Sequence, residues 1–82
     1  MYRILTEEKN VEQVKATLTG LGLDFTLFNA QGCWRGQREN SLAIELDNIS
    51  LSRAEDAARI IKSMNKQEAI LLQEIPVVSK LI

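Results

Sequence analysis

The chain has 82 residues, enough for one domain with a modest core, and a hydrophobic share of 45% that is usual for a globular protein. Its 10 basic and 11 acidic residues leave a formal net charge of −1, which argues against nucleic-acid binding. The chain has no histidine and a single cysteine, which argues against a structural zinc site and excludes an internal disulfide. The sequence shows no membrane span and no signal segment. We therefore expect a cytoplasmic protein without cofactor or metal.

A short strand and a helix are predicted first. Tyr2 and Ile4 alternate with Arg3, and Leu5 extends the apolar stretch, as in a short strand. Asn10 and Gln13 then have the spacing of a capping box, and glycines at 20 and 22 offer a left-handed stop. Between them lies one apolar helical stripe, formed by Val11, Val14, Leu18 and Leu21. These features predict a helix over residues 10–22.

Two strands are predicted next. Residues 23–30 carry apolar side chains on both faces, with Phe25 and Leu27 opposite Phe28. Residues 41–47 alternate cleanly, with one face apolar and the other small or polar. The apolar face consists of Leu42, Ile44 and Leu46, and the other of Ser41, Ala43 and Glu45.

The second half predicts a helix, a last strand and a tail. Ser52 with Glu55 at the third helical position forms a second capping-box pattern, and Asn65 is a plausible stop. The helical stripe between them consists of Ala54, Ala57, Ala58, Ile61 and Met64, small enough for the helix to lie close to a sheet. Residues 67–76 predict a strand that Pro76 ends.

The order strand, helix, strand, strand, helix, strand is the split β-α-β arrangement of ferredoxin-like domains. We therefore expect an α+β fold in which two helices cover one face of a four-stranded antiparallel sheet, with the first and third strands central. The domain would span residues 1–76, followed by an apolar tail over 77–82. A swapped dimer that pairs the elements differently is the alternative.

The uncovered face of this sheet predicts self-association. Phe28 on the second strand, and Leu71 and Ile75 on the last, would leave a sizeable apolar patch in water. We expect a homo-oligomer, most simply a dimer, to cover it. The apolar tail could also add a strand to a neighbour, fold under the sheet, or fray as termini often do.

The stretch GCWRGQREN, residues 32–40, admits two interpretations. The strands could extend to meet at residues 35–37 as a tight hairpin, with Gly36 at positive φ, Trp34 late on the strand and Cys33 an ordinary thiol. Alternatively the stretch is a ligand loop on a rigid scaffold. In that case Arg35 and Arg38 would pair with phosphate or carboxylate, Trp34 would stack on a ring, and Glu39 would accept from a hydroxyl or amine.

The same stretch resembles a pattern in small bacterial and phage proteins of uncharacterised function with a PII-like or ACT-like ferredoxin plait. The matching residues are Gly32, Trp34, Gly36, Glu39, Ser41, Leu42, Ile44, Glu45 and Leu46, together with residues 67–71, QEAIL. The resemblance implies an oligomer that binds a small metabolite or nucleotide in a cleft between subunits. The long basic loop of PII proteins and the glycine-rich turn of ACT domains are both missing here. Glu39 and Gln67 could form a pair in such a site, or Gln67 could be part of a plain polar turn.

Three functions compete on this evidence. The first is a non-catalytic binding or regulatory module that acts as a homo-oligomer, with a ligand site formed by Trp34, Arg35, Arg38, Glu39 and Gln67. The second is a protein-interaction factor, accessory or inhibitory, that uses Trp34 and Arg35 or a sheet edge. The third, a small enzyme using Cys33, Arg38, Glu39 or Glu45, is disfavoured because no paired carboxylates stand out. Nucleic-acid binding is disfavoured because aromatic residues are nearly absent from the two strands expected to be central.

Overall fold

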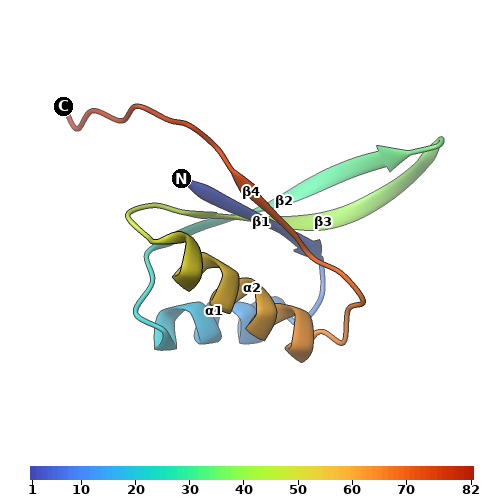
Figure 1. Ribbon diagram of the computed structural model, residues 1–82. Coiled ribbons are helices and arrows are strands. Elements are labelled where there is room, and N and C mark those ends of the chain that lie inside the picture. The colour runs from blue at the N-terminus through green and yellow to red at the C-terminus, as the bar shows by residue number, and fades with distance from the viewer.

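The computed structural model describes residues 1–82, apart from the side chain of Trp34. It is an α+β domain in which a four-stranded antiparallel sheet carries two helices on one face and leaves the other face open (Figure 1). The elements are β1 Tyr2–Glu7, α1 Val11–Gly20, β2 Phe25–Trp34, β3 Gln37–Leu46, α2 Leu51–Met64 and β4 Leu71–Glu74. No helix of the described residues has the length and apolar character to span a membrane.

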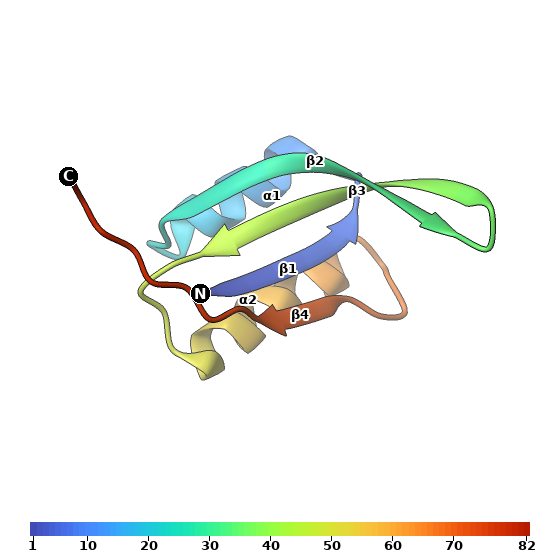
Figure 2. The same cartoon turned by 90° about the horizontal axis from the view of Figure 1, so that it is seen from above.

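The strands lie in the order β2-β3-β1-β4, so β1 and β3 are central as predicted (Figure 2). Residues directly opposite one another in paired strands share a face of the sheet. Ile4 on β1 pairs with Ile44 on β3 and with Leu72 on β4, and Ile44 pairs with Leu27 on β2. This row belongs to the face that the helices cover.

The core lies between that face and the two helices. Ile4, Ile44 and Leu46 from the sheet are fully buried together with Val14 and Leu18 from α1. The predicted stripe of α2 is confirmed, with its three alanines and Ile61 buried and Met64 packed against the cluster. Small residues on α2 bring its backbone close to the sheet, because no long side chain stands between them.

The tight-hairpin interpretation of residues 32–40 is confirmed for the backbone. β2 and β3 stay paired to Trp34 and Gln37, so only Arg35 and Gly36 form the loop. Both have positive φ, 50° and 79°, as a two-residue type I′ turn requires. The strands therefore run several residues beyond the ranges 23–30 and 41–47 predicted for them.

The capping box predicted for the first helix is wrong. Asn10 does precede α1, but its backbone is left-handed, with φ 54° and ψ 42°, and its side chain makes no capping hydrogen bond. Instead its Nδ2 donates to Oδ1 of Asn65 at 3.0 Å. The side chain that the sequence pattern assigned to the helix end therefore makes a tertiary contact instead.

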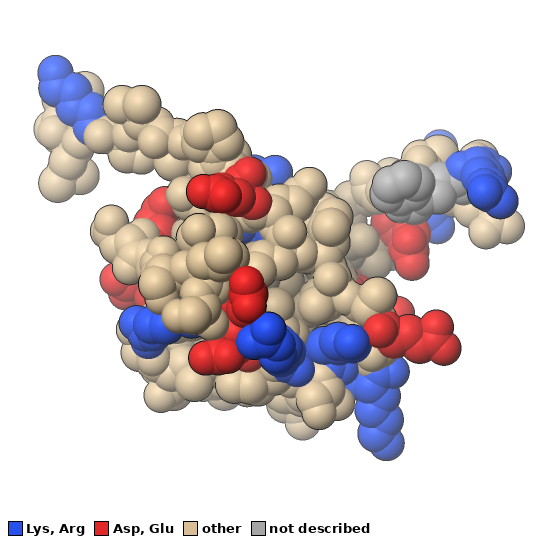
Figure 3. Space-filling view, viewed as in Figure 1, with Lys and Arg blue, Asp and Glu red and all other residues tan. Residues whose placement is uncertain are grey.

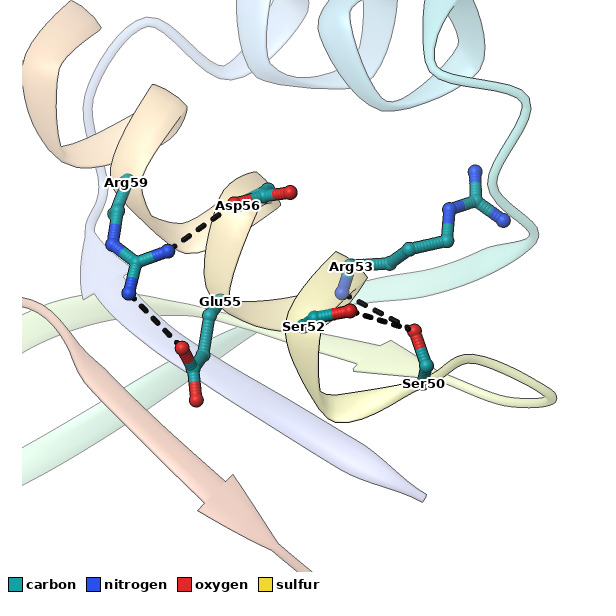
Figure 4. A network of polar contacts seen from close by, with 6 residues as sticks. All are labelled: Ser50, Ser52, Arg53, Glu55, Asp56 and Arg59. Atoms are coloured by element: carbon teal, nitrogen blue, oxygen red, sulfur yellow. Dashed lines mark hydrogen bonds and ion pairs between the residues drawn. The ribbon is translucent and has the colours of Figure 1, made fainter.

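The second helix begins earlier than predicted. Ser50, not Ser52, is the N-cap: its Oγ accepts from the backbone N–H of Arg53 at 3.3 Å (Figure 4). The earlier start places partly buried Ile49 just before the cap, where it packs against the core. Glu55, the expected capping partner of Ser52, instead accepts from Arg59 at 3.0 Å.

The last strand is shorter than predicted, because residues 65–67 complete the end of α2 and strand pairing does not begin until Leu71. Lys66 is left-handed, with φ 54°, and the backbone N–H of Gln67 donates to the carbonyl of Lys62 at 3.0 Å, as in a Schellman motif. Strand pairing starts only at Leu71 and ends where the N–H of Ile75 donates to the carbonyl of Met1 at 2.8 Å. Beyond it, Val78, Leu81 and Ile82 are fully exposed.

Candidate functional site

A shallow groove of about 390 Å³ lies where β1 ends while β3 continues into the hairpin. Ser41 on β3 pairs with Glu7, the last residue of β1. From Asn40 to the turn, β3 therefore has no strand beside it on the side where β1 lies. The segment between α2 and β4 forms the other wall. The lining residues are Leu5, Thr6, Glu7, Glu39, Ser41, Gln67, Ala69, Ile70 and Leu71.

A polar network fixes the inner wall of the groove. The Thr6 hydroxyl donates to Oε1 of Gln67, which also accepts from Nδ2 of Asn65 at 3.2 Å. The Nε2 of Gln67 donates to the carbonyl of Ala69 at 3.3 Å. Asn65 is completely buried, and Lys9 donates to its carbonyl at 2.8 Å. The network joins β1, the loop before α1, the end of α2 and the segment before β4, so Gln67 has a structural role.

The outer side of the groove is acidic. Glu7 and Glu39 are exposed, and the register places both on the open face of the sheet, beside Ser41. Among the described side chains, neither carboxylate forms an ion pair. The groove therefore attracts a cationic group and repels phosphate or carboxylate.

The predicted site residues are only partly brought together. Glu39 and Gln67, suggested as a pair, both line this groove within one chain. Arg35 lies in the turn, and Arg38 pairs with Cys33 on the opposite face of the hairpin from Glu39, so neither arginine lines it. The side chain of Trp34 lies outside the described part of the structure. The arrangement does not place the arginines and Glu39 around one ligand.

The residues considered for catalysis lie apart. Glu45 receives two hydrogen bonds from Arg3, at 3.2 and 2.5 Å, on the open face. Glu39 is six residues away on the same strand, about 20 Å at strand spacing, too far for two carboxylates to act on one bond. Cys33 is exposed on the hairpin. Among the described residues no group of ligands suits a metal ion.

The apolar patch predicted for the uncovered face is present, and the register arranges it as a row that crosses the sheet. Phe28, Ala43, Leu5 and Leu71 lie side by side on β2, β3, β1 and β4. Phe28 and Leu71 are 42% and 50% exposed, while Ala43 between its neighbours is buried. Phe28 and Leu71 were recognised singly as the outward residues of two strands, but their alignment depends on the register. Glu7 and Ser41 were missed as groove residues for this reason.

Comparison with known proteins adds no family to this geometry. No protein-family model matches the chain, and no curated protein matches its sequence.

Proposed function

We propose that this chain is a non-catalytic binding module with a ferredoxin-like plait that acts as a homo-oligomer, most simply a dimer, assembled through the open face of its sheet. The strand order supports the plait: β3 lies between β1 and β2, and β1 lies between β3 and β4, so both β-α-β units are split. The likeness to PII-like and ACT-like proteins remains part of this proposal.

The apolar row on the open face is the observation that carries the proposal. Leu5, Phe28, Ala43 and Leu71 span all four strands, and neither helix lies over this face of the sheet. Covering the row in two copies removes about 400 Å² of apolar surface from water, worth roughly 10 kcal/mol before the cost of association. The ion pair of Arg3 with Glu45 borders the row and neutralises the charge beside it.

A small ligand, if the module binds one, belongs in the groove beside Glu39 and Gln67. The carboxylates of Glu7 and Glu39, which line this groove, favour an amine or another cation over a nucleotide. A thermal-shift screen with polyamines, amino acids and nucleotides tests this part. A shift with nucleotides alone would contradict it.

Sedimentation velocity over a range of protein concentrations tests the oligomer. The variant Phe28→Lys/Leu71→Lys replaces the two exposed members of the row and should sediment as a monomer. The matched control Leu51→Lys/Ile60→Lys alters side chains of the same exposure, 48% and 40%, on the helix side and should keep the wild-type behaviour. A wild type that remains monomeric at every concentration would overturn the proposal, as would equal behaviour of the two variants.

A protein-interaction factor is the second candidate, and the edge strand β2 favours it. The sequence FTLFNAQGCW has ten residues without a charge or a proline, the features that normally protect an exposed edge from pairing. A partner could add a strand there. Thr26→Lys/Asn29→Lys introduces charges at two exposed positions of this edge. Loss of a captured protein, with self-association retained, would favour this function over the first.

A further inference from the structure

The hairpin arm, residues 31–40, projects from the body of the domain (Figures 1 and 2). Its described residues are exposed, apart from half-buried Gly32. Because β1 stops opposite Ser41, the two strands of the arm pair only with each other. A two-stranded hairpin is only marginally stable by itself in water, so a surface that packs on the arm would stabilise it.

Arg35 occupies an unfavourable backbone position at the end of this arm. Its φ of 50° is costly for a residue with a long side chain, and type I′ turns favour asparagine or glycine there. Local folding does not account for an arginine at this position, whereas an external contact of its guanidinium would. Among the described side chains Arg35 forms no ion pair.

The charges of the arm and the groove are complementary. Figure 3 shows basic residues at the outer end of the arm and acidic residues where the arm leaves the body. Glu7 and Glu39 are the carboxylates of the groove, and Arg35 of the same chain forms an ion pair with neither of them among the described side chains. The cation of one copy therefore suits the groove of another.

We propose, on the basis of the homo-oligomer proposed above, that the arm of each copy lies in the groove of a second copy, with Arg35 beside Glu7 and Glu39. A two-fold axis that brings the open faces of two copies together can also bring each turn to the other's groove, so both contacts form at once. Unpaired backbone groups along the inner edge of β3 offer hydrogen bonds to the incoming arm.

The area that a dimer needs supports a second copy as the occupant. The apolar row supplies about 400 Å², well below the roughly 1,200 Å² that stable interfaces bury. An exchanged pair of ten-residue arms provides the missing surface on both sides. The C-terminal tail of a neighbour is less suitable, because Lys80 is its only cation and Val77, Val78, Leu81 and Ile82 would enter a groove with an acidic rim.

A charge exchange between the two ends of the contact tests the proposal in the full chain. Arg35→Glu should weaken self-association at least about tenfold, because it places a third carboxylate in the groove. Glu7→Lys/Glu39→Lys should also weaken self-association, because it places two cations beside Arg35. An equimolar mixture should restore association, since the acidic turn then meets the basic groove and the native contact forms on the other side. Arg38→Glu, on the opposite face of the same arm, is the matched control and should associate like the wild type.

Sedimentation velocity at low salt measures these equilibria, and circular dichroism checks that each variant is folded. Restored association in the mixture, with an unaffected control, supports the arm exchange. If Phe28→Lys/Leu71→Lys dissociates the wild-type oligomer but Arg35→Glu does not, the arm exchange is wrong and the open-face oligomer stands. A monomeric wild type overturns both.

Discussion

Thr6 and Gln67 are directly linked: the Thr6 hydroxyl on β1 donates a hydrogen bond to the side-chain oxygen of Gln67, 61 residues further along the chain. The same oxygen accepts from fully buried Asn65. One glutamine therefore connects the end of β1, the end of α2 and the segment that leads into β4.

Replacing that glutamine should destabilise the fold. Gln67→Leu removes the acceptor of both Thr6 and Asn65, and unsatisfied buried donors should lower the free energy of unfolding by about 1–3 kcal/mol. Urea denaturation followed by circular dichroism measures the loss. The neighbouring exposed Glu68→Leu serves as the control and should change stability by less than about 0.5 kcal/mol. Equal stability of the two variants would show that the network contributes nothing.

The two serines at the start of α2 should differ in importance. Ser50→Ala removes the oxygen that caps the N–H of Arg53 and should cost about 1 kcal/mol. Ser52→Ala leaves that cap in place and should cost well under half as much, although Ser52 lies only two residues away. Thermal unfolding of the two variants compares them directly. A larger effect at Ser52 would indicate that the helix starts where the capping-box pattern placed it.

Glycine should stabilise the fold more than lysine does at position 66, just after α2. Lys66 holds a left-handed conformation in the Schellman motif, which glycine adopts without steric cost. Lys66→Gly should raise the free energy of unfolding by about 0.5–1 kcal/mol, after the entropy of the unfolded chain is allowed for. Lys62→Gly, inside the last turn of the helix, should lower it by about 1 kcal/mol. Denaturant titrations should show changes of opposite sign in the free energy of unfolding for these two lysine-to-glycine substitutions.

The alanines of α2 should not tolerate enlargement. Ala57 is 1% exposed, so Ala57→Leu forces extra methylene groups between the helix and the core and should cost about 1–3 kcal/mol. Ala16→Leu makes the same change on the exposed side of α1 and should be close to neutral. Differential scanning calorimetry measures both, and a neutral Ala57→Leu would contradict the close packing of α2.

The element order and the alanine stripe of α2 could be predicted from periodicity, and the central position of β1 and β3 from the split β-α-β topology that this order implies. The ends of the elements could not. Asn10 and Ser52 both satisfy a local capping pattern, yet Asn65 takes the side chain of the first, and packing of Ile49 favours Ser50 over the second. These competing contacts come from residues far away in the sequence or from the core.

The groove was predictable only in part, for a similar reason. Glu39 and Gln67 were suspected as a pair, and both line it. That Glu7 joins them, and that Arg38 lies on the other face of the hairpin, depends on the register between β1, β2 and β3. A shift of one residue would exchange the two faces, and alternation within a single strand does not fix the pairing between strands.

The hydrogen bond from Ile75 to Met1 holds the two ends of the folded domain next to each other, and Figure 2 places them at the end of the sheet away from the hairpin. An affinity tag, a fluorophore or a fused protein attached at either end should therefore leave the groove and the arm accessible.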